Sequence, residues 1–192
     1  MSLAPLKLII AGDGGVGKTT LLRRYVEGTY EHSTLTVGSD FASKTVNMNH
    51  TEIQAIFWDF GGEPRFRMLF PSFCNGAHGA VLVFDISRFV TFNSLEEWLT
   101  LIREVEPNIP IILIGSKCDL NRSVDFDTAQ AFADSHKIES YFEVSAQSNT
   151  GVQDALRYII RRAFECKYNG HSKPNNEETL SDTEALTPVP QE

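Results

Sequence analysis

Residues 6–20 read LKLIIAGDGGVGKTT, the most informative stretch of the chain. The nearly continuous apolar run at 6–11 is typical of a strand buried on both faces of a parallel sheet. The string GDGGVGKT at 12–19 matches the G-x-x-x-x-G-K-[ST] phosphate loop, and a helical pattern, TTLLRRYVEG, follows it. A strand, a glycine-rich loop and a helix in this order predict an α/β fold with a phosphate site at its first turn.

The residue types in this loop fit phosphate chemistry. Glycines let main-chain N–H groups turn toward phosphate oxygens, and the N-terminus of the following helix adds a favourable field. Lys18 would neutralise the outer phosphates, and the Thr19 hydroxyl could ligate Mg²⁺. A chance glycine-rich turn is the alternative, which the flanking strand and helix patterns disfavour.

Three more apolar runs resemble the first. They lie at 80–85 (AVLVFD), 110–116 (PIILIGS) and 141–145 (YFEVS), and each ends in Asp or Ser. Apolar residues with helical spacing lie at 95–102 and 152–164. This alternation predicts right-handed βαβ units, and hence a doubly wound sheet with ligand chemistry at the carboxyl ends of its strands.

The segment at 40–60 departs from the alternation. Two extended stretches, around FASKTV at 41–46 and EIQAIFWDF at 52–60, flank a turn near 47–50. This pattern predicts a hairpin at the edge of the sheet.

Charge and composition limit the partners. With 17 Lys and Arg against 25 Asp and Glu, the net charge is −8, and no basic stripe is present, so we expect no binding to nucleic acid.

No apolar run approaches the roughly 20 residues that a membrane span needs. Position 2 is Ser and the last residues, TPVPQE, contain no Cys, so we expect no lipid anchor and no stable membrane insertion. Three scattered cysteines fit a reducing compartment, and we expect a cytoplasmic protein.

The later strand ends indicate which base is bound. After the run at 110–116, Asp119 is placed to accept two hydrogen bonds from the N1–H and the exocyclic amine of guanine, with the Lys117 stem along the base. In isolation this KxD pattern is equally compatible with an Asp that caps the next turn. Main-chain N–H groups of Ser145-Ala146-Gln147 could bind guanine O6.

The end of the hairpin carries a further set of polar groups. In Trp58-Asp59-Phe60-Gly61-Gly62, Asp59 is placed to hold the Mg²⁺ shell. The Gly62 N–H is free to approach a γ-phosphate.

Over about 6–167, the chain resembles the Ras superfamily in the order of its guanine-nucleotide boxes, which are GDGGVGKTT, Thr36, WDFGGE, SKCD and SAQ. The strings TVGSDF, WDFGGEPRFR and NGAHGAVLVFDIS are similar to the Rab branch, although DFGG is also similar to Arf proteins. The resemblance implies a small GTPase that switches between GTP and GDP with Mg²⁺. It also implies a three-layer α/β domain at 6–168, with a mostly parallel six-stranded sheet, one antiparallel edge strand and helices on both faces. A short extension at 1–5 and an acidic tail at 169–192, expected to be disordered, flank it.

The resemblance also assigns residues. Gly14 matches the position where a side chain would obstruct hydrolysis, and Thr36 matches the threonine that completes the Mg²⁺ shell when the γ-phosphate is present. Tyr30 matches the aromatic residue on the guanine face, with an ordinary surface aromatic as the alternative. The main-chain amides expected to wrap the phosphates are those of Gly15, Val16, Gly17, Lys18, Thr19 and Thr20.

The resemblance implies protein partners as well. Phe41, Trp58 and Phe73 match the aromatic cluster through which Rab proteins are read by effectors, with simple core or edge packing as the alternative. Exchange factors, effectors and a GTPase-activating protein are the implied partners at the switch regions. No arginine finger can be assigned within the chain, so slow intrinsic hydrolysis is expected.

Three positions depart from the family pattern. The expected catalytic residues are Lys18, Gly62 and Glu63, and Glu63 replaces the family's water-orienting Gln. An ionised Glu adds negative charge near an anionic transition state, whereas a Glu with a raised pKa could still orient or deprotonate water. Ser116 replaces an Asn that braces the base loop, and a hydroxyl would replace this brace only in part. Gln147 replaces Lys with little expected effect.

Two other functions remain alternatives. A GTP-bound interaction module with little or no hydrolysis follows if Glu63 disables the chemistry. A P-loop ATPase or small-molecule kinase shares only the phosphate loop, and Asp119 disfavours it.

Overall fold

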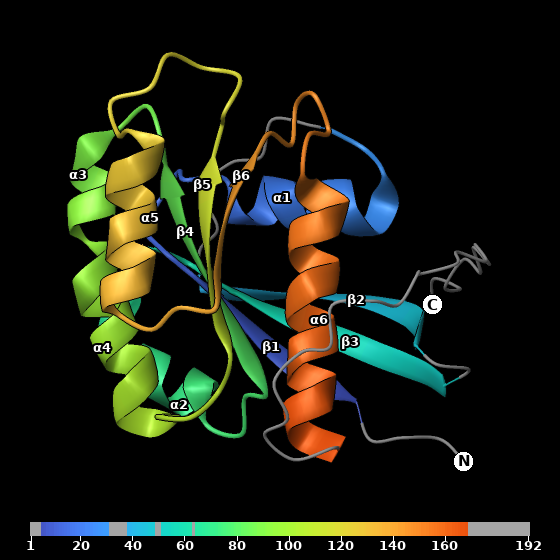
Figure 1. Cartoon of the computed structure of the whole chain (residues 1–192). Coiled ribbons are helices and arrows are strands. Elements are labelled where there is room, and N and C mark those ends of the chain that lie inside the picture. The colour runs from blue at the N-terminus through green and yellow to red at the C-terminus, as the bar shows by residue number, and fades with distance from the viewer. Residues whose placement is uncertain (1–4, 31–37, 49–50, 63, 169–192) are drawn as a thin grey trace.

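The computed structural model describes residues 5–30, 38–48, 51–62 and 64–168. In this part of the chain, one six-stranded sheet carries helices on both faces (Figure 1). The elements in chain order are β1 (Leu6–Ala11), α1 (Lys18–Glu27), β2 (Ser39–Met48), β3 (Thr51–Phe60), the 3₁₀ helix η1 (Pro64–Leu69), α2 (Phe70–Cys74), β4 (Gly79–Asp85), α3 (Phe89–Asn93), α4 (Leu95–Val105), β5 (Ile111–Ser116), α5 (Phe126–Ser135), β6 (Ser140–Val144) and α6 (Val152–Tyr168). The predicted α/β class is confirmed.

The sheet has the strand order β2-β3-β1-β4-β5-β6. Strands β2 and β3 pair antiparallel, and every other neighbouring pair is parallel. The predicted hairpin is therefore confirmed at the edge of the sheet, with longer strands than the sequence indicated. Of its predicted turn, residues 49 and 50 lie outside the described residues.

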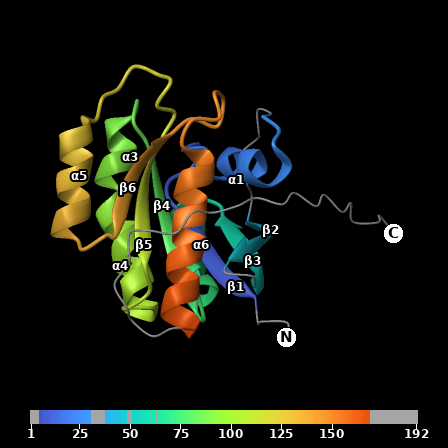
Figure 2. The ribbon, with the colours of Figure 1, turned by 45° about the vertical axis from the view of Figure 1, so that its right-hand side comes forward.

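Each face of the sheet has its own helical layer. Helices α1 and α6 cover one face, and α2 to α5 cover the other (Figures 1 and 2). Within β1, Leu8 and Ile10 pack toward α1 and α6, while Ile9 and Ala11 belong to the core on the opposite side. Because both faces are covered, the central strands are nearly continuous in apolar residues.

The predicted amphipathic helices are present as α4 and α6. The sequence reasoning missed α5, in which only Ala129 and Ala133 are buried. Such small and sparse apolar residues leave little periodic signal. No helix in the described ranges is both long and apolar enough to span a membrane. The acidic tail at 169–192 and most of the extension at 1–5 lie outside these ranges.

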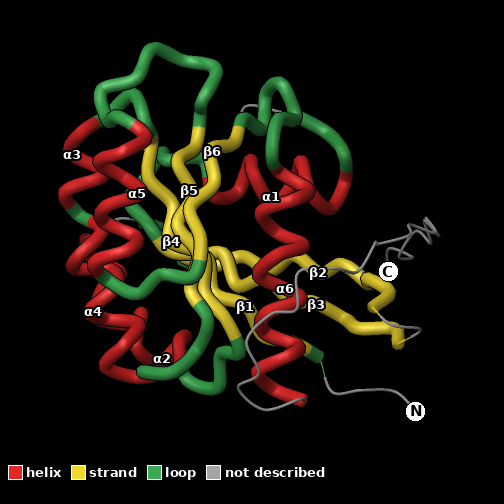
Figure 3. The backbone as a smooth tube through the Cα atoms, in the orientation of Figure 1, coloured by secondary structure: helices red, strands yellow, loops and turns green. Residues whose placement is uncertain are grey.

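The topology brings five strand ends to one edge. Strands β3, β1, β4, β5 and β6 run parallel, so their carboxyl ends lie at the same edge of the sheet. Figure 3 shows loops gathering above the ends of β4, β5 and β6, close to α1. The sequence motifs follow these strands, so the fold collects them around the start of α1.

Candidate functional site

The phosphate loop connects β1 to α1. Gly17 lies in the left-handed region with φ 95° and forms the N-cap of α1. A residue with a Cβ would be strained there, whereas glycine adopts this conformation at little cost. The loop therefore turns sharply into the helix, so the N-terminus of α1, which favours anions, lies at the loop.

Lys18 is the buried cation of this loop. Its side chain is 6% exposed, and Nζ donates to the carbonyl oxygens of Gly12 at 2.7 Å and Asp13 at 2.9 Å. Burial lowers the pKa of Lys18 to about 8, against the opposing effect of Asp59 and Asp13. A buried ammonium with two carbonyl partners is fixed in place, and its charge is available to an anion within the loop.

Thr19 and Asp59 form an oxygen pair at the start of α1. The Thr19 hydroxyl donates to Oδ2 of Asp59. The other carboxylate oxygen, Oδ1, is buried and has no hydrogen-bond partner in the described structure. Burial raises the pKa of Asp59, while Thr19 and Lys18 act to lower it. A hydroxyl beside an unpartnered carboxylate oxygen fits Mg²⁺, which binds hard oxygen ligands.

Gly62 packs directly on the phosphate loop. A Cβ at this position would lie 2.2 Å from the carbonyl carbon of Asp13 and 2.4 Å from the nitrogen of Gly14. The neighbouring Gly61 N–H donates to the Gly38 carbonyl at 2.8 Å, which joins the end of β3 to the start of β2. Only glycine allows this close approach. Thr36 and Glu63 lie outside the described residues.

Ser116 joins the end of β5 to the phosphate loop. Its Oγ lies 2.6 Å from the Val16 carbonyl oxygen and 2.9 Å from that of Phe84, and the side chain is 5% exposed. A hydroxyl has one proton to share between these two acceptors. The hydroxyl brace expected in place of the usual Asn is therefore present.

Lys117 makes a second bridge to the phosphate loop. Its Nζ donates to the Gly15 carbonyl at 2.9 Å and forms an ion pair with Oδ2 of Asp85 at 2.7 Å. Burial raises the pKa of Asp85, but hydrogen bonds from Lys117 and Ser87 outweigh it and lower the pKa overall. The sequence reasoning missed Asp85, although it ends a buried strand.

The two base loops lie side by side. The Cys118 N–H donates to the Val144 carbonyl at 3.1 Å, which connects the loop after β5 with the loop after β6. Ser145 is buried, and its Oγ accepts the Ser148 N–H at 3.1 Å. Asp119, which directly follows Cys118, is exposed. The fold thus brings the two predicted base motifs together next to the phosphate loop.

A polar cluster that the sequence reasoning missed joins the phosphate loop to η1 and α4. Oδ1 of Asp13 accepts hydrogen bonds at 2.9 Å from both Arg67 Nη2 and Trp98 Nε1. The Arg67 guanidinium also lies 4.8 Å from the centroid of the Trp98 ring and forms an ion pair with Glu97. We call these four residues the Asp13–Arg67 cluster. No local sequence signal marks it, because its members are far apart in the chain.

The three predicted effector residues form a continuous aromatic row across β2, β3 and α2. The ring centroids of Phe41 and Trp58 are 4.6 Å apart, and those of Trp58 and Phe73 are 5.9 Å apart. Phe41 is 54% exposed. Lys7 Nζ lies 4.0 Å from the Trp58 ring centroid.

This sheet, its phosphate loop and its paired base loops define a P-loop nucleotide-binding domain. Comparison with known proteins narrows the class: a Ras family model matches residues 7–165. The chain is 41% identical over 154 residues to the Ras-related protein Rab-1A of Dictyostelium discoideum, an alignment that covers 78% of this chain and 76% of that protein. The chain therefore belongs to the Ras family and is a Rab-like small GTPase, as the sequence motifs indicated.

Proposed function

We propose that this protein is a GTP/GDP-dependent switch that binds guanine nucleotide with magnesium and hydrolyses GTP to GDP and phosphate. The observation that carries the proposal is the grouping of Lys18, Thr19 and Asp59 at the start of α1, beside the two base loops. In this proposal, main-chain amides of 15–20 surround the phosphates and Lys18 neutralises them. Asp119, the amides of 145–147, the Lys117 stem and Tyr30 hold the base.

Thr19 and Asp59, joined by Thr36 in the GTP state, would hold magnesium. The ion supplies a divalent charge that stabilises the phosphate oxygens when bound. The Gly62 N–H, held against the phosphate loop, would meet the γ-phosphate, and Glu63 would face the attacking water. Order in these loops then depends on the γ-phosphate, and partners read that order.

We infer that the aromatic row of Phe41, Trp58 and Phe73 is part of the surface that effectors read. Its exposed member, Phe41, belongs to the edge hairpin, whose first strand begins at Ser39, shortly after Thr36 in the chain. Exchange factors and a GTPase-activating protein would act through the same switch segments. The described cysteines Cys74, Cys118 and Cys166 are all free, which supports a cytoplasmic location.

Base identity is tested with Asp119→Asn. The carboxylate accepts two hydrogen bonds from guanine, whereas an amide presents a donor that suits the additional carbonyl of xanthine. The variant should lose GDP and gain xanthosine diphosphate in a competition assay. Asp127→Asn, which removes the same charge from an exposed site on α5, should leave the guanine preference unchanged. Equal binding of ATP and GTP by the unaltered protein would contradict the proposal.

A GTP-bound module with little hydrolysis is the second candidate, and Glu63 in place of Gln favours it. The nucleotide released by denaturing the purified protein separates the two. Mostly GDP supports a working hydrolase, and mostly GTP supports the stalled module. Under the second candidate, Glu63→Gln should accelerate single-turnover hydrolysis, because the amide restores a donor toward the γ-phosphate.

A further inference from the structure

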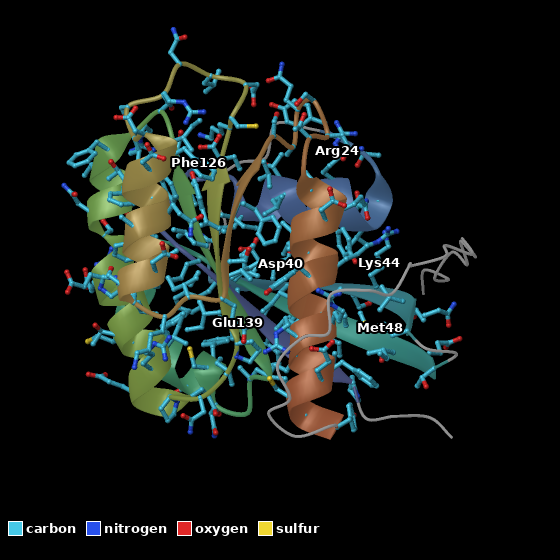
Figure 4. All side chains as sticks on the ribbon, viewed as in Figure 1. Arg24, Asp40, Lys44, Met48, Phe126 and Glu139 are labelled. Carbon is cyan, nitrogen blue, oxygen red and sulfur yellow. The ribbon has the colours of Figure 1, made fainter. Side chains whose placement is uncertain are left out.

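Arg24, in the last turn of α1, donates to three main-chain carbonyls on two separate segments of the chain. Nε donates to the Ala146 carbonyl at 2.7 Å, Nη2 to the Gln147 carbonyl at 3.3 Å and Nη1 to the Gly28 carbonyl at 2.7 Å. All three guanidinium nitrogens are therefore used. Figure 4 labels Arg24 where the end of α1 meets the loop between β6 and α6.

The first contact orients a peptide plane of the base loop. In a trans peptide, the C=O of one residue and the N–H of the next point to opposite sides. Because Arg24 holds the Ala146 carbonyl, the N–H of Gln147 points away from Arg24. The Gln147 carbonyl is held in the same way, and the Ser148 N–H on its far side donates to Ser145 Oγ at 3.1 Å. The loop is thus fixed from both sides.

The remaining contacts orient the segment that leads to Tyr30. Gly28 ends α1 in the left-handed conformation, with φ 72°, and Arg24 satisfies its carbonyl. A cation is favourable at a helix C-terminus. The guanidinium carbon also lies 5.8 Å from the centroid of the Tyr30 ring. One side chain therefore contacts both the 145–147 loop and the aromatic residue after α1.

We propose that Arg24 is a positioning residue for guanine recognition, which aims the Gln147 N–H at O6 of the base. This inference rests on the proposed function, and it assigns Arg24 no contact with the nucleotide. Arginine suits the task because its planar fork donates in several fixed directions at once, whereas the lysine ammonium is a compact charge on a flexible stem.

The test compares dissociation of GDP and 6-thio-GDP from the full-length, magnesium-loaded protein. The thio analogue keeps the N1–H and the amine that Asp119 would accept, but it replaces O6 with sulfur, a weak acceptor. The unaltered protein should release GDP more slowly than 6-thio-GDP. Arg24→Gln should accelerate GDP release about tenfold, the worth of one charge-assisted hydrogen bond. Release of 6-thio-GDP should change much less. The ratio of the 6-thio-GDP release rate to the GDP release rate should therefore fall toward one.

Two further variants separate positioning from general stability. Arg24→Lys keeps the charge but not the fork, so it should also lower the ratio. Arg103→Gln is the matched control, because Arg103 donates to the carbonyls of Pro107 at 3.1 Å and His136 at 3.3 Å, away from the base loops. It should lower the thermal midpoint and leave both release rates unchanged.

Each outcome is decisive. If Arg24→Gln and Arg24→Lys accelerate both nucleotides by the same factor, or neither nucleotide, Arg24 does not position the O6 contact and the inference is wrong. If the unaltered protein retains neither GDP nor its analogue, the proposed function itself fails, and the inference fails with it.

Discussion

Two ends of the site are held by different kinds of contact: the base end, formed by the loops after β5 and β6, and the switch end, where η1 meets the phosphate loop. At the base end, Ser116, Lys117 and Arg24 all donate to main-chain carbonyls of neighbouring loops. At the switch end, the Asp13–Arg67 cluster joins η1 to the phosphate loop through side chains that are 19% exposed for both Arg67 and Asp13. Partly exposed ion pairs contribute only about 0–1 kcal/mol, whereas a buried acceptor that loses its donor costs about 1–3 kcal/mol. Ser116, whose two contacts are buried, therefore holds the base end more firmly than the partly exposed Arg67–Asp13 pair holds η1 to the phosphate loop.

The largest effect is expected at Lys18, the buried cation of the phosphate loop. Lys18→Gln removes the buried charge, and its shorter side chain leaves the Gly12 and Asp13 carbonyls without their donor. We expect at least roughly a 100-fold loss of GDP affinity, corresponding to about 2.7 kcal/mol, measured by calorimetry. Lys44→Gln is the control, since Lys44 Nζ donates to the Tyr25 carbonyl at 2.7 Å, outside the phosphate loop. An equal loss in both variants would contradict this role for Lys18.

Ser116 tests the stiffness of the base end. Ser116→Ala leaves the buried Val16 carbonyl without its donor and should accelerate GDP dissociation about tenfold. Ser116→Asn should slow dissociation, because its amide has two protons for the two acceptors that now share one. Release of a fluorescent GDP analogue measures both. Unchanged rates would show that this brace does not hold the nucleotide.

The pH dependence of binding follows from burial of Lys18. Its pKa in the folded protein is lowered to about 8, and a bound phosphate would raise it by favouring the charged form. Binding above pH 8 therefore takes up a proton, and GDP affinity should fall about fourfold between pH 7 and pH 8.5. Calorimetry in two buffers of different ionisation enthalpy measures the uptake. A flat profile with no proton uptake would contradict the buried-cation account.

The same shift affects stability in the absence of nucleotide, with the opposite dependence on pH. The folded pKa of about 8 lies below the ordinary lysine pKa of 10.5, so the unfolded chain binds more protons between these values. The free energy of unfolding should therefore gain a contribution as pH rises through this window, and lose it as pH falls back toward 8. Denaturant titrations of nucleotide-free protein measure this contribution.

The smallest effect is expected at the Asp13–Arg67 cluster. Arg67→Gln and Asp13→Asn should each change nucleotide release only about twofold to fivefold, and their double-mutant cycle should give a coupling of about 0.5–1 kcal/mol. Trp98 reports the change directly, because its Nε1 donates to the same Asp13 oxygen. In a Trp58→Phe background it is the single remaining tryptophan, and its emission should shift in both variants. A coupling above about 2 kcal/mol would remove the contrast between the two ends.

The parts of the fold that the sequence predicted have strong local signals. Central strands such as β4 are buried on both faces and read as unbroken apolar runs. Helix α6 has a full apolar stripe, whereas α5 buries only Ala129 and Ala133 and was missed. In the site, Lys18 and Asp119 could be predicted because each belongs to a motif that follows the end of an apolar strand pattern. Arg67 and Arg24 were missed because nothing near them in the chain distinguishes them from surface charges, whereas Asp85 was missed although it ends the apolar run of β4.

Local sequence alone specifies the phosphate loop and the strand and helix that flank it. The reason is local: the turn at Gly17 needs a residue without a Cβ, and Lys18 bonds to carbonyls only five and six residues away. How the loops are held together depends on contacts between distant parts of the chain. Arg24 meets Ala146 across 122 positions, and Arg67 meets Asp13 across 54. An arginine can donate to any carbonyl or carboxylate within reach, so its partner is set by which chain segments the packed sheet brings beside it.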